Sequence, residues 1–263
     1  MILIHSCTSN NQEVIKNENG NICMKCELKN GVRNGKCYEY YPNGDIYVIS
    51  SWIAGVQNGK KIVYFENGTI KETSIWEDGN LEGEVIEYSG KGYVHKVKQY
   101  MNGKPDGLWI HFFEGYPMRA MQYVIVKDYQ EYLNQWWVYD YFGDVKKEES
   151  HYYSIYSEKG DSIKAGVAGV LKVKLEAPVF GGYMKLVTGN FDNKFNPIDA
   201  TKLDTINCVG FEGTVKYKFD EIGTHFVQGI ILDAKKGKGY DEKGEYTETK
   251  QREIYFIRTI EVY

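Results

Sequence analysis

The chain has 263 residues, of which 42% are hydrophobic and 26% charged, the proportions of an ordinary folded protein. Its net charge of −4 and pI near 5.8 argue against nucleic-acid binding, which requires a positive surface. The 23 Tyr, 28 Gly and only 5 Pro favour many short strands joined by glycine turns, and the absence of any run of 18 apolar residues means that no membrane-spanning helix is predicted.

The first residues bear on where the protein is located. Ile4-His5-Ser6-Cys7 has the aliphatic, spacer, small residue and Cys order that bacterial lipoprotein processing recognises. Only six residues precede Cys7, whereas a signal peptide has a basic start and roughly 7–15 apolar residues. We favour a lipidated Cys7, with residues 1–19 as a flexible tether that includes the remnant of a secretion signal. The alternative is an ordinary N-terminus with an incidental thiol.

Cys23 and Cys26 form a C-x-x-C motif, which occurs in zinc and redox sites. A strand is expected over residues 21–29, where a separation of three sends the two side chains to opposite faces. No second C-x-x-C or H-x-x-x-H completes a tetrahedral site. We expect small, partly buried thiols here and at Cys37 and Cys208, with no disulfide framework, no metal and no cofactor.

A 24-residue period runs through the first half of the chain. Three glycine series and two aromatic series share it. They are Gly31, Gly55, Gly79 and Gly103; Gly35, Gly59, Gly83 and Gly107; Gly20, Gly44, Gly68 and Gly92; Tyr40, Tyr64, Tyr88 and Phe112; and Trp52, Trp76 and Tyr100. A fixed period indicates an array of one supersecondary unit.

The unit is clearest in GVQNGKKIVYFENGTIKETSIWED, residues 55–78. It predicts a five-residue glycine loop, a strand, an Asn-Gly turn in which both residues tolerate positive φ, and a return strand. Alternation places Ile62 and Tyr64 on one face of the first strand, and Ile70 and Trp76 on one face of the second. Each hairpin has an apolar side that it cannot bury alone, so neighbouring hairpins should stack.

Four copies keep the pattern most fully: GVRNGKCYEYYPNG (31–44), GVQNGKKIVYFENG (55–68), GNLEGEVIEYSGKG (79–92) and GKPDGLWIHFFEG (103–115). A half copy precedes them, and a degenerate copy, NQWWVYDYFGDV (134–145), follows. These copies resemble the MORN-type repeat family in its bacterial variant. The resemblance implies an elongated antiparallel meander over residues 20–152 and a non-catalytic role in protein interaction or scaffolding. Many bacterial members are described as antitoxin-like.

The period stops near His151, and residues 153–263 follow a different pattern. Segments such as GVAGVLKVKLEA and REIYFIRTIEVY alternate with period two and are separated by glycine or charged turns. We expect a β-sandwich, and an immunoglobulin-like one, although the Cys…Trp…Cys hallmark is absent. The predicted fold class is therefore all-β, an elongated antiparallel meander of 24-residue β-hairpin repeats followed by a β-sandwich.

No catalytic site is predicted. His225 lies on an alternating strand, where a structural role is favoured over a role as a general base. The oxygen-rich loop at residues 191–199 lacks the ligand spacing of a calcium loop. The motifs G-x-S-x-G, H-E-x-x-H and G-x-x-x-x-G-K-[ST] do not occur. We expect a protein that is not an enzyme.

The candidate binding surface consists of the repeat aromatics Tyr40, Tyr64, Tyr88, Phe112, Trp52, Trp76 and Tyr100. Cross-strand packing would explain the same residues. We expect a bacterial cell-envelope lipoprotein that binds a protein partner through its repeat sheet and contacts the membrane only through Cys7. Two alternatives stay open: a cytosolic antitoxin-like protein that sequesters a partner, and an envelope protein that binds a glycan.

Overall fold

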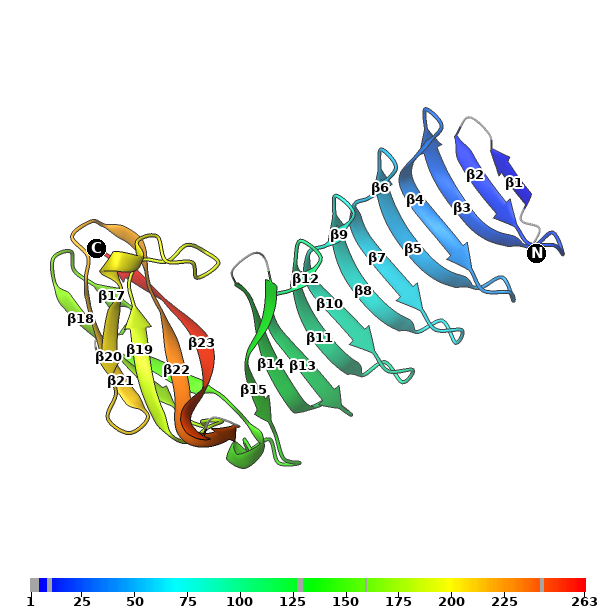
Figure 1. Ribbon diagram of the computed structural model, residues 1–263. Helices are drawn as coiled ribbons and strands as arrows, with labels where there is room; N and C mark the ends of the chain where they lie inside the picture. Colours follow the sequence, from blue (N-terminus) through cyan, green and yellow to red (C-terminus); the bar gives the residue numbers. More distant parts are fainter. Residues whose placement is uncertain (1–4, 9–10, 127–129, 159, 242–243) are drawn as a thin grey trace. The chain divides into compact units, whose positions relative to one another are not determined.

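The computed structural model describes residues 5–8, 11–126, 130–158, 160–241 and 244–263. Within these ranges the chain is all-β, with no α-helix and short 3₁₀ turns at Lys147–Glu149 and Ala200–Lys202. It forms two compact units, Met1–Ala120 and Met121–Tyr263 (Figure 1). The predicted fold class, a hairpin meander followed by a sandwich, is confirmed.

A 15-stranded antiparallel meander contains the repeats, and the first three full repeats each contribute one hairpin (β4/β5, β7/β8 and β10/β11 in Figure 1). Its strands are β1 (His5–Thr8), β2 (Gln12–Lys16), β3 (Ile22–Lys29), β4 (Val32–Tyr40), β5 (Ile46–Ile53), β6 (Val56–Gln57), β7 (Gly59–Tyr64), β8 (Ile70–Glu77), β9 (Asn80–Leu81), β10 (Gly83–Tyr88), β11 (Val94–Met101), β12 (Lys104–Pro105), β13 (Gly107–Phe113), β14 (Tyr116–Val126) and β15 (Gln130–Val138).

The predicted five-residue glycine loop is instead a tight two-residue turn followed by strand. Ala54 (φ 49°) and Gly55 (φ 85°) form the turn, because positive φ at both positions matches the twist of the flanking strands. β6 then pairs with β5, and the chain continues into β7. The loop prediction was wrong because only the first of the two glycines lies in a reversal.

The Asn67-Gly68 turn also differs from the prediction, which gave both residues positive φ. Gly68 has φ 80°, whereas Asn67 is not in the left-handed region. The turn is closed by Phe65 N–H donating to Thr69 O at 2.8 Å. The Asn67 side chain accepts from Thr69 N–H at 3.0 Å, so it caps the turn rather than adopting an unusual backbone conformation.

A β-bulge in the return strands β5, β8 and β11 changes which side chains share a face. In β8 the register shifts by one residue at Lys71, so that Ile70 is opposite Tyr64 while Trp76 is opposite Gly59. Equivalent shifts occur in the hairpins β4/β5 and β10/β11. The prediction that Ile70 and Trp76 share a face was therefore wrong: Ile70 lies with Tyr64, and Trp76 lies on the other side of the sheet.

Part of the expected N-terminal tether is strand. Gln12–Lys16 form β2, which pairs with β3 along five residue pairs. β1 pairs with β2 in turn, and Cys7 is opposite Val14. The Cys7 side chain lies outside the described part of the structure, so its predicted lipidation stays a prediction.

Cys26 and Cys37 form a disulfide between β3 and β4, and both are buried. They are direct cross-strand partners with a Cα–Cα distance of 4.0 Å. The expectation of free thiols was wrong for this pair, because a bulge between Cys26 and Leu28 sets a register that the sequence pattern does not reveal. Cys23 and Cys208 are free.

The second unit contains the sandwich. A three-stranded sheet, β16-β18-β21, faces a five-stranded sheet, β17-β23-β22-β19-β20, in which β17 and β23 form a short parallel pair. Strand bounds are β16 (Tyr153–Ser157), β17 (Ser162–Ile163), β18 (Ala168–Leu175), β19 (Tyr183–Thr188), β20 (Asp204–Asn207), β21 (Glu212–Lys218), β22 (Gly223–Asp241) and β23 (Gly244–Val262).

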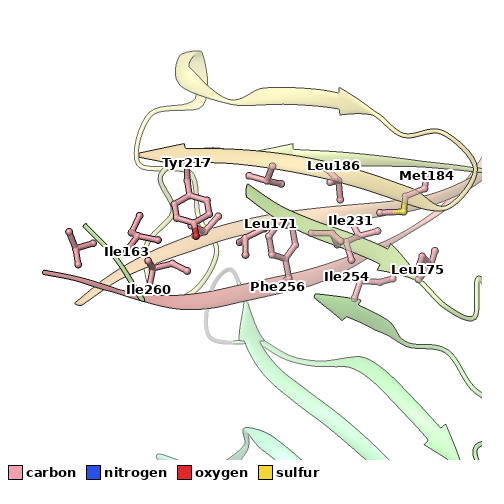
Figure 2. Close-up of a cluster of buried hydrophobic side chains, with 14 residues drawn as sticks. Ile163, Leu171, Leu175, Met184, Leu186, Tyr217, Ile231, Ile254, Phe256 and Ile260 are labelled. Atoms are coloured by element: carbon pink, nitrogen blue, oxygen red, sulfur yellow. The ribbon is translucent and has the colours of Figure 1, made fainter. Parts of the chain in front are cut away.

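Alternating residues of both sheets fill the space between them (Figure 2). Leu171, Leu186, Ile231 and Phe256 are fully buried there. A second cluster, on the outer side of β22 and β23, joins Ile230 and other side chains to Val126 of β14. The end of β14 therefore packs with the sandwich.

Candidate functional site

Cross-strand pairing aligns a row of mostly apolar side chains across the repeats. In order, each the Cα partner of the next, they are Tyr38, Ile49, Ile62, Thr73, Ile86, Val97 and Ile110. None of them is buried. Tyr40, Tyr64, Tyr88 and Phe112 lie two residues further along the same strands and so on the same side. We call this surface the ladder face.

The opposite surface, which we call the tryptophan face, carries Trp52, Trp76 and Tyr100, each opposite a glycine of the neighbouring strand. The indole Nε1 of Trp52 donates to Ser50 Oγ at 2.8 Å, and Trp76 makes the equivalent bond at 3.1 Å. All the buried side chains from β3 to β11 lie on this face: Cys26, Cys37, Val48, Ser50, Val63, Ser74 and Val85. The tryptophans therefore lie on the face of the sheet that carries the buried side chains of the repeats.

Charged side chains of the tryptophan face pair with one another. Glu87 receives both Lys98 Nζ at 2.5 Å and Lys96 Nζ at 3.3 Å. Burial alone would raise the pKa of Glu87, but the two lysines outweigh it and lower the pKa. Lys61 Nζ lies 5.7 Å from the centre of the Trp76 ring. The charge of Glu87 is therefore balanced on this face.

The ladder face is different, because large apolar side chains remain exposed on it. Ile75 is 44% exposed and Leu108 40%. Ile46 and Ile70, opposite Tyr40 and Tyr64, are exposed as well. The predicted site residues thus divide between two surfaces, with the Tyr40 series on the ladder face and the Trp52 series on the tryptophan face. The structure does not bring the seven aromatics together.

The second unit contains a polar pocket that the sequence did not predict. It has a volume of about 500 Å³ and is lined by Tyr132, Trp136, Val179, Phe180, Gln251, Arg252 and Glu253. The Arg252 guanidinium lies 4.9 Å from the Trp136 ring centre and 5.5 Å from that of Tyr132. It also donates to the main-chain oxygens of Leu133 and Asn134, so its position is fixed.

Two buried polar side chains support this pocket. The Asp233 carboxylate, fully buried, accepts from Val179 N–H at 2.7 Å and Phe180 N–H at 3.3 Å. His151 Nδ1 is 2.7 Å from Ala177 O, and because a carbonyl only accepts, this nitrogen carries the hydrogen. Burial lowers the pKa of His151 to about 4, so the ring is neutral. Asp233 and His151 are far apart in sequence from the residues that they contact, so no local sequence motif predicts these contacts.

His225 has structural contacts. Its ring stacks on Phe219 at 4.4 Å, and Nε2 is hydrogen-bonded to Glu221 O at 2.8 Å. In the oxygen-rich loop, Asp192 accepts from the main-chain N–H groups of Lys194 and Asn196. The Asn196 side-chain amide also donates to Asp192 at 3.0 Å, and this bond, followed by the main-chain bonds, lowers the pKa of Asp192.

No family model matches this chain, and no curated protein sequence matches it. The described segments include no helix with the length and apolar character needed to cross a bilayer.

Proposed function

We propose that this chain is a non-enzymatic protein-binding module of the bacterial cell envelope, tethered through a lipidated Cys7, and that the ladder face takes the partner. The observation that carries this proposal is the contrast between the two faces of the repeat sheet. Buried residues and charge pairs lie on the tryptophan face, whereas the ladder face keeps apolar side chains uncovered. Cores of protein interfaces are rich in aromatic residues, and the Tyr40 series supplies such residues on the ladder face.

The size of the ladder face also suits a protein partner. Seven neighbouring strands of the meander, from β4 to β13, carry it. At about 4.8 Å between strands they span roughly 30 Å. A standard interface buries about 800 Å² on each partner, which corresponds to a similar width.

The Cys26–Cys37 disulfide supports the envelope location over the cytosol. Disulfides persist in oxidising compartments and are rare in the cytosol. Processing before Cys7 would leave two of the four residues of β1 in place.

The alternatives remain distinguishable from this proposal. A cytosolic antitoxin-like protein could use the same ladder face, and then the two cysteines would be reduced in the cell. A glycan ligand would instead use the pocket around Arg252, where aromatic rings and planar polar side chains line one cavity.

Site-specific photocrosslinking tests the proposal. p-Benzoylphenylalanine is placed at Ile62 or Ile86 on the ladder face, and at Lys61 on the tryptophan face, in cells that produce the protein naturally. We expect one discrete protein adduct from both ladder positions and none from position 61.

A pair of charge variants provides the matched control. Thr73→Glu puts a charge in the middle of the ladder row, and Glu72→Lys changes a charge on the other face. Thr73→Glu should reduce the adduct at least tenfold, and Glu72→Lys should leave it unchanged. Equal adducts from both faces, or none from the ladder face, would contradict the proposal.

A further inference from the structure

A hollow at the ends of the third and fourth repeats interrupts an otherwise regular arrangement. It has a volume of about 410 Å³, and its walls include Tyr93 and Val94 of the third repeat and Phe112 and Phe113 of the fourth. Phe113 is 63% exposed. Phe112 belongs to the ladder face, so the hollow is continuous with it.

The hollow occurs where the repeat series lacks an aromatic residue. Tyr41, Phe65 and Ser89 occupy the same position in three successive repeats and begin the same turn. In each case the residue's N–H donates to the oxygen four residues later, and its own oxygen accepts from the glycine three residues later. The backbone is therefore equivalent in the three repeats, and only the side chain changes.

Tyr41 shows what an aromatic side chain does at this position. Its hydroxyl donates to the main-chain oxygen of Tyr64, in the next repeat, at 2.7 Å. Its ring lies 4.8 Å from that of Tyr47. By the 24-residue period, Tyr64 corresponds to Phe112, which lines the hollow. A ring at position 89 would therefore fill the space that Ser89 leaves open.

We propose that this hollow is an anchor site for one aromatic side chain of the partner protein. This inference rests on the proposed function, because the partner on the ladder face supplies the ring that the chain supplies to itself in the first repeat. The occupant is an aromatic side chain, since the chain fills the equivalent space of the first repeat with Tyr41. Aromatic anchors in well-packed pockets commonly carry most of an interface's binding energy.

The probe for this site is N-acetyl-tyrosinamide, titrated into the ¹⁵N-labelled full-length protein and followed by amide chemical shifts. We expect saturable shifts confined to the amides of Gly90, Val94 and Phe113, with half-saturation at roughly 1–10 mM. N-acetyl-alaninamide, which has no ring, should produce none of them.

Two variants decide the assignment. Ser89→Phe restores the aromatic series, fills the hollow and should abolish the shifts while leaving the protein folded. Tyr41→Ser opens the equivalent space next to Tyr47 and Phe65, and should add a second set of shifts there. Absence of saturable shifts in the unchanged protein, or their persistence in Ser89→Phe, would falsify the anchor site.

The outcome is separable from that of the crosslinking experiment. The capped tyrosine reports on the hollow whether or not a partner binds the ladder face. If the capped tyrosine does not bind but Ile62 still crosslinks to a partner, the anchor site is wrong and the proposed function stands. If the capped tyrosine binds but Ile62 gives no adduct, the hollow binds an aromatic ring and the proposed function is wrong.

Discussion

At the scale of single residues, the unusual group is His151. It is fully buried beside Trp136, whose ring centre is 5.0 Å away, and it faces Arg252 and Asp233. Burial is the main cause of its low pKa, and the positive Arg252 adds to it, while the hydrogen bond to Ala177 O and the negative Asp233 oppose it. The folded protein therefore holds this ring neutral at pH values where an exposed imidazole would be charged.

His151 should make the second unit sensitive to acid. Its pKa is about 4 in the folded state and near 6.5 when unfolded, so its contribution to stability is complete above pH 6.5 and is lost as the pH falls towards 4. The loss is at most roughly 3 kcal/mol. Urea unfolding of the second unit, followed at pH 7, 5.5 and 4.5, measures it.

His151→Asn serves as the control, because an amide can still donate to Ala177 O but does not titrate in this range. Its unfolding free energy should fall less between pH 7 and 4.5 than that of the unchanged protein, although carboxylates titrate in both. Parallel pH profiles for the two proteins would show that His151 is not the sensitive group.

At the scale of elements, the two-residue turns of the meander follow one rule. Asn30, Ala54, Asp78, Asn102 and Glu114 all have φ between 46° and 55°, and each is followed by a glycine with positive φ. Asn and Asp adopt this left-handed conformation more readily than Ala does. The turn at Ala54 therefore carries a strain that the turns at Asn30 and Asn102 largely avoid.

Ala54→Asn should stabilise the first unit by about 0.5–1 kcal/mol. Ala54 is exposed, and its main-chain N–H bond to Asn34 does not involve its side chain. The reverse change, Asn102→Ala, should destabilise the unit by a similar amount. Chemical denaturation of both variants measures the two effects. Unchanged midpoint concentrations of denaturant in both would show that the turn at Ala54 is not strained.

The same elements show what the sequence could and could not predict. The 24-residue period predicted the hairpins β4/β5, β7/β8 and β10/β11, because the glycines mark positions that require positive φ. Simple alternation put Ile70 and Trp76 on one face, and the bulge at Lys71 overturned this. The pocket around Arg252 depends on contacts such as Tyr132 Oη donating to Glu253 O, 121 residues away in sequence. Local patterns contain no information about such pairs.

At the scale of the whole molecule, the two units have different sources of stability. The second has a core of aliphatic and aromatic side chains between two sheets. The first is a single sheet, whose few buried residues include the disulfide-bonded Cys26 and Cys37. Each repeat contacts only its neighbours, so a link between β3 and β4 acts mainly on the start of the meander.

Reduction of the Cys26–Cys37 disulfide should therefore affect one unit only. The bond closes a loop of 11 residues, for which the chain-entropy model gives a contribution of roughly 3 kcal/mol. Residue-level hydrogen exchange with and without dithiothreitol measures it. Protection should fall in β2 to β5 and stay constant in the sandwich core, and the Cys26→Ser/Cys37→Ser variant should reproduce the reduced pattern.

The same bond separates the envelope and cytosolic alternatives when it is examined in intact cells. Rapid alkylation during lysis, followed by mass spectrometry, shows whether Cys26 and Cys37 were already joined, and the same spectra give the mass of the peptide that begins at Cys7 or Met1. A joined pair with a lipidated Cys7 is the expected result, because an oxidising compartment is where both features arise. Alkylated thiols at both positions, with an unmodified Met1, would instead place the ladder face and its partner in the cytosol.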